Sequence, residues 1–150
     1  MAPDDATPTR SRDDRPDNGP RPFAWTGTGD VLVADDEPTV RNLTARALQR
    51  LGLTPVSCED GAAAVAAVRG EPDRWRLVVL DLSMPVMDGA EALSAMRSVR
   101  RDLPAVISSG YSEDELAGRV ADRHGVAFLQ KPFTVHSLAQ AVRLALSETV

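Results

Sequence analysis

Short apolar runs and amphipathic segments alternate along the chain from residue 31 onward. Five aliphatic runs predict strands over residues 31–34, 54–58, 77–80, 105–107 and 127–129. After each run, apolar residues recur at helical spacing, which predicts helices over residues 38–51, 61–69, 88–96, from 112 onward and 134–147. The order strand–helix, repeated five times, is typical of an α/β fold with a parallel sheet, helices on both faces and right-handed crossovers.

Two of these runs indicate where their strands lie in the sheet. Residues 77–80 (LVVL) are apolar at every position, as expected of a central parallel strand that helices cover on both faces. Residues 54–58 contain Pro55, which cannot donate a backbone hydrogen bond. We therefore expect residues 77–80 at the centre of the sheet and residues 54–58 at an edge.

Local sequence signals mark several helix ends. Pro38 suits the first turn of a helix, because its missing N–H would have no partner there. Asp88 with Glu91, and Ser112 with Glu115, have the spacing of a capping box, in which each side chain bonds the backbone of the other residue. These pairs predict two helix starts. Leu116 and Val120 are the apolar positions that follow the second start.

The first 29 residues differ from the rest of the chain. They hold five of the 11 prolines and show neither strand nor helix periodicity. We predict a disordered tail over residues 1–29 and one domain over residues 30–150. Phe23 and Trp25 are the only large apolar side chains of this tail, and two hypotheses stay open for them: docking on the domain, or exposure.

Composition removes several classes of protein. The chain has 17 Lys and Arg residues against 22 Asp and Glu, a net charge of −5, which argues against a nucleic-acid partner. The single cysteine, Cys58, excludes an intramolecular disulfide. No apolar run approaches the roughly 20 residues of a membrane span, and the polar start does not resemble a secretory signal. We therefore expect a cytoplasmic protein without a membrane partner.

Polar side chains follow four of the five predicted strands. They are, in chain order, Asp35 and Asp36, then Asp81, then Ser108 and Ser109, then Gln130 and Lys131. In open parallel sheets the ligand site lies at the carboxyl ends of the strands, so we expect these groups at one edge. An Asp pair before a helix or a Lys-Pro turn is commonplace alone, but this joint placement indicates a site.

Three carboxylates in one place repel each other unless a cation joins them. Oxygen ligands favour Mg²⁺, and a nearby amine and hydroxyl would complete a site for a phosphoryl group. Asp81, at the end of the most buried strand, is the candidate nucleophile, while Asp35 and Asp36 are candidate metal ligands. Lys131 is the only lysine in the chain, which suggests a position where arginine does not serve.

The same segments together resemble the receiver domains of bacterial two-component response regulators. The resemblance covers residues 30–148 and rests on four motifs: VLVADDEP (31–38), LVVLDLSMPVMDG (77–89), VISSGY (106–111) and FLQKPF (128–133). It implies a flavodoxin-like α/β fold, a five-stranded parallel sheet of order 2-1-3-4-5 with helices on both faces.

The resemblance also implies roles for the site residues. Asp81 would accept a phosphoryl group from a histidine kinase or phosphotransfer protein, forming an aspartyl-phosphate. Asp36 and Asp81 would bind Mg²⁺ directly, with the backbone carbonyl of Ser83, while Asp35 would act through water. Lys131 would pair with the phosphoryl oxygens.

Two further residues occupy the positions that change conformation on phosphorylation in this family. Ser109 would move to bind one phosphoryl oxygen. Phe128 stands at the aromatic switch position, and since a phenyl ring donates no hydrogen bond, switching there would depend on packing. The partner-binding surface would comprise the last two helices and the last strand.

The segments SGYS and FLQKPFT resemble the corresponding segments of receiver domains at the C-terminus of hybrid sensor kinases. We expect a stand-alone receiver with no DNA-binding output domain, acting in a phosphorelay as a relay, a phosphate sink or an adaptor toward an unknown downstream protein. Its only expected catalysis is its own phosphorylation and dephosphorylation, so it is not expected to be an enzyme in the usual sense.

Three alternatives are less favoured. A Mg²⁺-dependent phosphohydrolase would carry a second Asp where this chain has Ser83. A flavin mononucleotide carrier would not place carboxylates beside the phosphate. A dinucleotide loop would follow the first strand, whereas Gly27 and Gly29 precede it.

Overall fold

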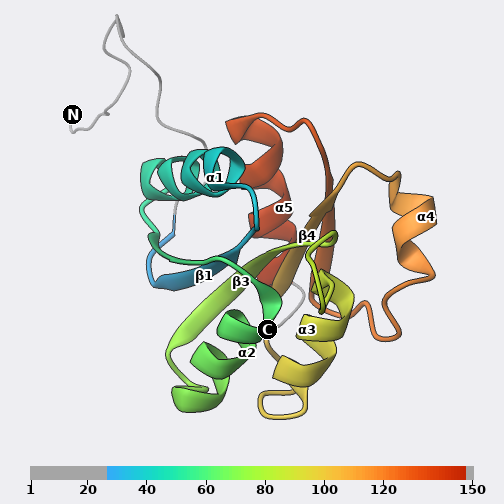
Figure 1. Cartoon of the computed structure of the whole chain (residues 1–150). Helices are drawn as coiled ribbons and strands as arrows, with labels where there is room; N and C mark the ends of the chain where they lie inside the picture. Colours follow the sequence, from blue (N-terminus) through green and yellow to red (C-terminus); the bar gives the residue numbers. More distant parts are fainter. Residues whose placement is uncertain (1–26, 148–150) are drawn as a thin grey trace, which may run out of the picture.

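Five parallel strands form one sheet in the computed structural model, which describes residues 27–147. The strands are β1 (Asp30–Ala34), β2 (Thr54–Cys58), β3 (Trp75–Asp81), β4 (Ala105–Ser109) and β5 (Val126–Gln130). Their order in the sheet is β2-β1-β3-β4-β5, so β3 is central and β2 lies at an edge (Figure 1). The predicted fold class and strand order are confirmed.

Five helices follow the strands in turn. They are α1 (Pro38–Arg50), α2 (Gly61–Gly70), α3 (Gly89–Arg97), α4 (Glu113–Ala117) and α5 (Val135–Ser147). Helices α1 and α5 pack on one face of the sheet, and α2 and α3 on the other (Figure 1). Helix α4 stands beside β5 at the side of the molecule, with Leu116 as its one buried residue.

The core consists of two apolar layers separated by the sheet. Alternate residues of a strand face opposite sides, so Val31 and Val33 of β1 join the layer under α1 and α5, whereas Leu32 joins the layer under α2 and α3. Residues 77–81 of β3 are all buried, as predicted for a central strand. Burial on both faces fixes the position at which β3 ends, and therefore the position of Asp81.

Both predicted capping boxes are present. Asp88 accepts a hydrogen bond from the Glu91 N–H, and the Glu91 carboxylate accepts one from the Asp88 N–H. Ser112 and Glu115 make the same reciprocal pair at the start of α4. Helix α4 ends at Ala117, because Gly118, a poor helix former, follows it.

Residues 27–29, which the sequence assigned to the tail, are hydrogen-bonded to the domain. The Gly27 N–H donates to the Leu51 carbonyl, and the Gly29 carbonyl accepts from the Thr54 N–H. Residues 1–26, including Phe23 and Trp25, lie outside the described residues, so the tail over residues 1–26 stays a prediction. Within residues 27–147, every helix is too short or too polar to span a bilayer.

The start of α3 packs directly on the backbone at the end of β3. A Cβ atom on Gly89 would lie 2.6 Å from the Asp81 carbonyl oxygen, and the Gly89 N–H donates to the Leu82 carbonyl at 2.9 Å. No side chain fits there, so a glycine at this position sets how α3 approaches the strand that carries Asp81.

We predict that Gly89→Ala lowers the free energy of unfolding by about 1–3 kcal/mol, because the added methyl group meets backbone that cannot move without distorting β3. The matched control is Gly70→Ala, at the end of α2, where an added Cβ meets nothing within 4 Å. That variant should be neutral or slightly stabilising. Urea unfolding of the two variants checks the prediction, and equal stabilities would contradict it.

Candidate functional site

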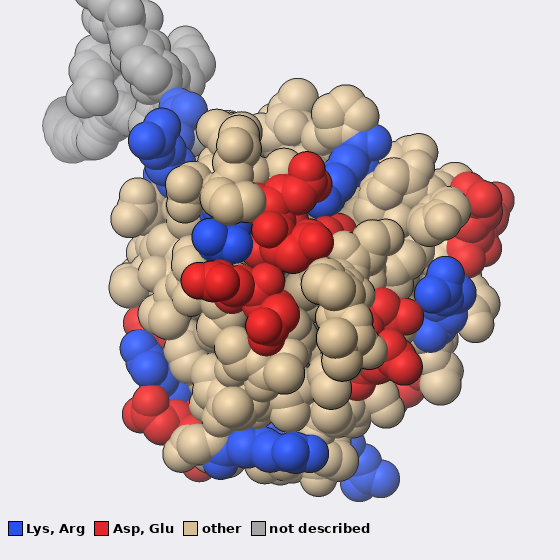
Figure 2. All heavy atoms as spheres, in the orientation of Figure 1, with Lys and Arg blue, Asp and Glu red and all other residues tan. Residues whose placement is uncertain are grey.

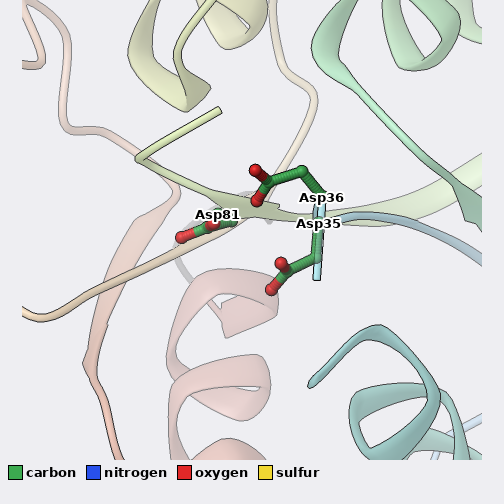
Figure 3. Close-up of side chains that lie close together, drawn as sticks. All are labelled: Asp35, Asp36 and Asp81. Carbon is green, nitrogen blue, oxygen red and sulfur yellow. The ribbon is translucent and has the colours of Figure 1, made fainter. Parts of the chain in front are cut away.

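Three carboxylates converge at the carboxyl ends of β1 and β3. Asp35 and Asp36 follow β1 directly, and Asp81 is the last residue of β3, which pairs with β1. Each residue offers a carboxylate oxygen within 4.8 Å of those of the other two (Figure 3). The sheet therefore brings together residues that are more than 40 positions apart, as the sequence predicted.

The three carboxylates differ in burial. Asp35 and Asp81 are 4% and 5% exposed, while Asp36 is exposed to solvent. Burial, followed by the negative charge of Asp35, raises the pKa of Asp81 from 3.8 to about 6, although Lys131 acts in the opposite direction. The cluster carries more negative charge than its surroundings neutralise, which favours a bound cation.

Lys131 supplies the one ammonium group that touches this cluster among the described residues. Its Nζ lies 3.1 Å from Asp81 Oδ1, 3.4 Å from Asp35 Oδ2 and 3.7 Å from Glu37 Oε1. The Lys131 N–H donates to the Ser109 carbonyl at 2.7 Å, which fixes the residue beside β4, and its bond to Pro132 is cis. Burial acts to lower the pKa of Lys131, but the charges of Asp81 and Asp35 outweigh it and raise the pKa, so the amine stays protonated.

The Glu37 backbone N–H and the Arg41 side chain hold Asp35 in place. Its Oδ1 accepts from the Glu37 N–H at 2.9 Å, and its carbonyl accepts from Arg41 Nη1 at 2.7 Å. Its other carboxylate oxygen faces Lys131, so both oxygens have partners within the chain. Asp36 is more available to an added ligand. The sequence analysis missed Glu37, whose only signal was its place directly after the Asp pair.

The two predicted switch residues lie on β4 and β5. Ser109 ends β4 and is 1% exposed, and its hydroxyl accepts from the Tyr111 N–H at 2.9 Å. Phe128 is half-buried in β5, and it packs against the apolar layer under α2 and α3. A backbone hydrogen bond from Ser83 reaches the Asp81 carboxylate and acts to lower its pKa. The roles expected of these three residues stay predictions.

The site thus combines hard oxygen ligands with an ammonium group, and its donor set fits a Mg²⁺ ion. The sequence model of the response regulator receiver domain matches residues 31–143. The chain belongs to this family. Receiver domains are signalling domains of two-component systems, and they generally bind Mg²⁺ and interact with histidine kinases or phosphotransfer proteins.

Individual relatives agree with this family. The chain is 35% identical over 118 residues to the sensor kinase CckA of Brucella abortus, covering 79% of this chain and 12% of that protein. It is 37% identical over 117 residues to the transcriptional regulatory protein PdtaR of Mycobacterium tuberculosis, covering 78% and 56%. The chain therefore spans only part of these relatives.

A solved structure shows the same fold. The response regulator receiver protein of Sinorhizobium medicae superposes with a TM-score of 0.73 and 26% identity, covering 82% of this receiver chain and 98% of that one. The five-stranded order and the flanking helices are thus those of a receiver.

The raised pKa of Asp81 predicts a pH-dependent stability. Because the folded pKa of about 6 exceeds the unfolded value of 3.8, protonation favours the folded state, and the charged side chain destabilises it at neutral pH. In metal-free buffer at about pH 7.5, Asp81→Asn should raise the free energy of unfolding by about 2 kcal/mol.

That gain should shrink as the pH falls toward about 4.5, where Asp81 of the wild type becomes protonated in the folded state. Urea unfolding at several pH values measures the difference between the two proteins. The control is Asp102→Asn, which removes an exposed carboxylate outside the cluster and should show little such trend. A constant difference at all pH values would contradict the prediction.

Proposed function

We propose that this receiver is a phosphorylation-activated switch of a phosphorelay, with Asp81 as the phosphoacceptor. One observation carries the proposal: the Lys131 ammonium lies 3.1 Å from the buried carboxylate of Asp81, within a group of three carboxylates. A phosphoryl group on Asp81 would meet this ammonium directly. The family relationship and the similarity to a sensor kinase support the same assignment.

The proposed reaction transfers a phosphoryl group from a histidine to Asp81. A carboxylate oxygen of Asp81 attacks phosphorus, an O–P bond forms and the N–P bond of the phosphohistidine breaks. The imidazole nitrogen leaves with the electron pair and takes up a proton. Lys131 stabilises the negative charge on the phosphoryl oxygens, and the Ser109 hydroxyl donates a hydrogen bond to one of them.

We assign the metal site to the same residues. Asp36, Asp81 and the Ser83 carbonyl would hold Mg²⁺, with Asp35 acting through water. When bound, the ion supplies positive charge that offsets the carboxylates and the transferred phosphoryl group. Exposure of Asp36 supports its place as a direct ligand, and the contacts of Asp35 with Lys131 and the Glu37 N–H support an indirect one.

The switch would begin at Ser109. A movement of its hydroxyl toward a phosphoryl oxygen would break the hydrogen bond that the hydroxyl now accepts from the Tyr111 N–H. Released from this bond, the segment that leads into α4 would shift, and Phe128 would repack beside it.

The output surface would comprise α4, β5 and α5. It already holds a groove of about 670 Å³, and its lining includes Glu113, Phe128 and Leu144. We propose that an unknown downstream protein binds there. A cytoplasmic location belongs to the same proposal. The protein would catalyse only its own phosphorylation and dephosphorylation, as a relay, a sink or an adaptor.

Incubation with acetyl phosphate and Mg²⁺ should add one phosphoryl group to the wild-type chain, as measured by intact mass. Asp81→Asn should remain unlabelled, because the amide is not a nucleophile of comparable strength. The Asp102→Asn variant, which changes an exposed carboxylate at the far end of the sheet, is the matched control and should label normally. Absence of label on the wild type, or equal label on Asp81→Asn, would reject the proposed function.

Lys131→Arg should separate phosphorylation of Asp81 from its effect on binding of the downstream protein. The ammonium fits between three carboxylates as a compact point charge, and a guanidinium is broader and planar. We expect the variant to accept phosphoryl groups at Asp81 but to lose the phosphorylation-dependent gain in binding to the downstream protein. Binding that responds to phosphorylation as in the wild type would contradict this prediction.

A phosphotransfer profile against the histidine kinases of the source organism would identify the upstream partner needed for such assays.

A further inference from the structure

Val86 has an unfavourable backbone conformation in the loop between β3 and α3. Its φ is 71°, and it is the one non-glycine residue with positive φ among residues 27–147. The Met87 N–H donates to the Pro85 carbonyl at 2.7 Å, which closes a three-residue γ-turn with Val86 at its centre. This form of the turn is rare and strained, and a β-branched side chain is especially poorly suited to it.

The Val86 side chain contributes no buried contact that would offset this backbone strain. Its relative exposure is 103%, the highest among the large apolar residues that the structure leaves exposed. The neighbouring Met84, by contrast, is 7% exposed and packs into the core. Glycine or asparagine would adopt this backbone at lower cost, so folding alone does not account for a valine here.

The loop holds Val86 in a fixed place. The Leu82 carbonyl accepts hydrogen bonds from the N–H groups of Met84 at 3.2 Å and Gly89 at 2.9 Å, which ties both sides of the loop to the end of β3. Gly61 of α2 packs against Met87, since a Cβ there would lie 2.9 Å from the Met87 carbonyl oxygen. The valine is therefore presented to solvent by a braced turn.

This turn lies on the rim of the acidic site. Val86 comes five residues after Asp81, in a loop whose two ends meet at the carboxyl end of β3. The exposed residues that follow β1 on the same rim are Asp36 and Glu37, and acidic side chains gather over this face (Figure 2). A protein that brings a phosphohistidine to Asp81 has to cover this rim, whereas a small phosphodonor can enter without touching Val86.

We propose that Val86 is a contact residue for the phosphodonor protein, packing its exposed methyl groups against an apolar patch beside the donor's phosphohistidine. The inference rests on the proposed function of Asp81. It explains why a strained and exposed valine stands in the loop that follows Asp81: the side chain becomes buried when the donor binds. Residues held in sparsely populated backbone conformations cluster at such functional sites.

The test compares Val86→Asn and Val86→Ile with the wild type. The donor is the autophosphorylated histidine kinase that labels the wild type fastest in the transfer profile, and rates are measured over a range of receiver concentrations. For Val86→Asn we expect the half-saturating concentration to rise about tenfold, the effect of losing one buried aliphatic side chain, with the saturating rate unchanged. Val86→Ile keeps the apolar contact and should transfer like the wild type.

Two further measurements separate contact from loop geometry. Val86→Asn should unfold at a higher temperature than the wild type, because asparagine tolerates positive φ, and acetyl phosphate should label both at the same rate. Val99→Asn, a half-exposed valine after α3 at the opposite end of the sheet, is the matched control and should change no rate.

The outcomes are distinguishable. A Val86→Asn variant that accepts phosphoryl groups from the kinase as the wild type does would overturn the contact. Equal losses with the kinase and with acetyl phosphate would also overturn it, since Val86 would then act through the shape of the loop. Failure of acetyl phosphate to label the wild type would instead overturn the proposed function, and this inference with it.

Discussion

The Lys131 ammonium sits between two buried carboxylates, 3.1 Å from Asp81 and 3.4 Å from Asp35, and the site depends on this contact. Neither carboxylate is favourable as a buried anion alone, and a buried ammonium is unfavourable without partners. The three groups follow or end β1, β3 and β5, so the contact exists only when the whole parallel sheet has formed. The packing of Gly89 against Asp81 and the two apolar layers serve to hold these strand ends in register.

One ammonium does not neutralise the cluster. The raised pKa of Asp81 records the remaining imbalance, which comes first from burial and then from Asp35. Under the proposed function, this imbalance favours uptake of a metal ion, and the ammonium beside Asp81 would meet an added phosphoryl group. Under the proposed function, the features that make the cluster costly in the folded protein are those that make it responsive to phosphorylation.

The loop after β3 shows a second conflict between stability and function. Capping by Asp88 and the hydrogen bonds to Leu82 favour an ordered loop, whereas Val86 at its tip strains the backbone and buries nothing. Proteins violate local preferences mainly where function requires it. The acidic cluster and the valine turn are two such places, and they lie at the same edge of the sheet.

The sequence by itself determined the five strands, the five helices, both capping boxes and the meeting of Asp35, Asp36 and Asp81 at one edge. Periodicity and capping are local signals, and the carboxyl ends of parallel strands meet by topology. Only the tertiary structure decided that Glu37 approaches Lys131 and that Val86 has a positive φ. These features depend on the relative placement of side chains 94 residues apart, Glu37 and Lys131, and on how a loop is braced, which no local pattern encodes.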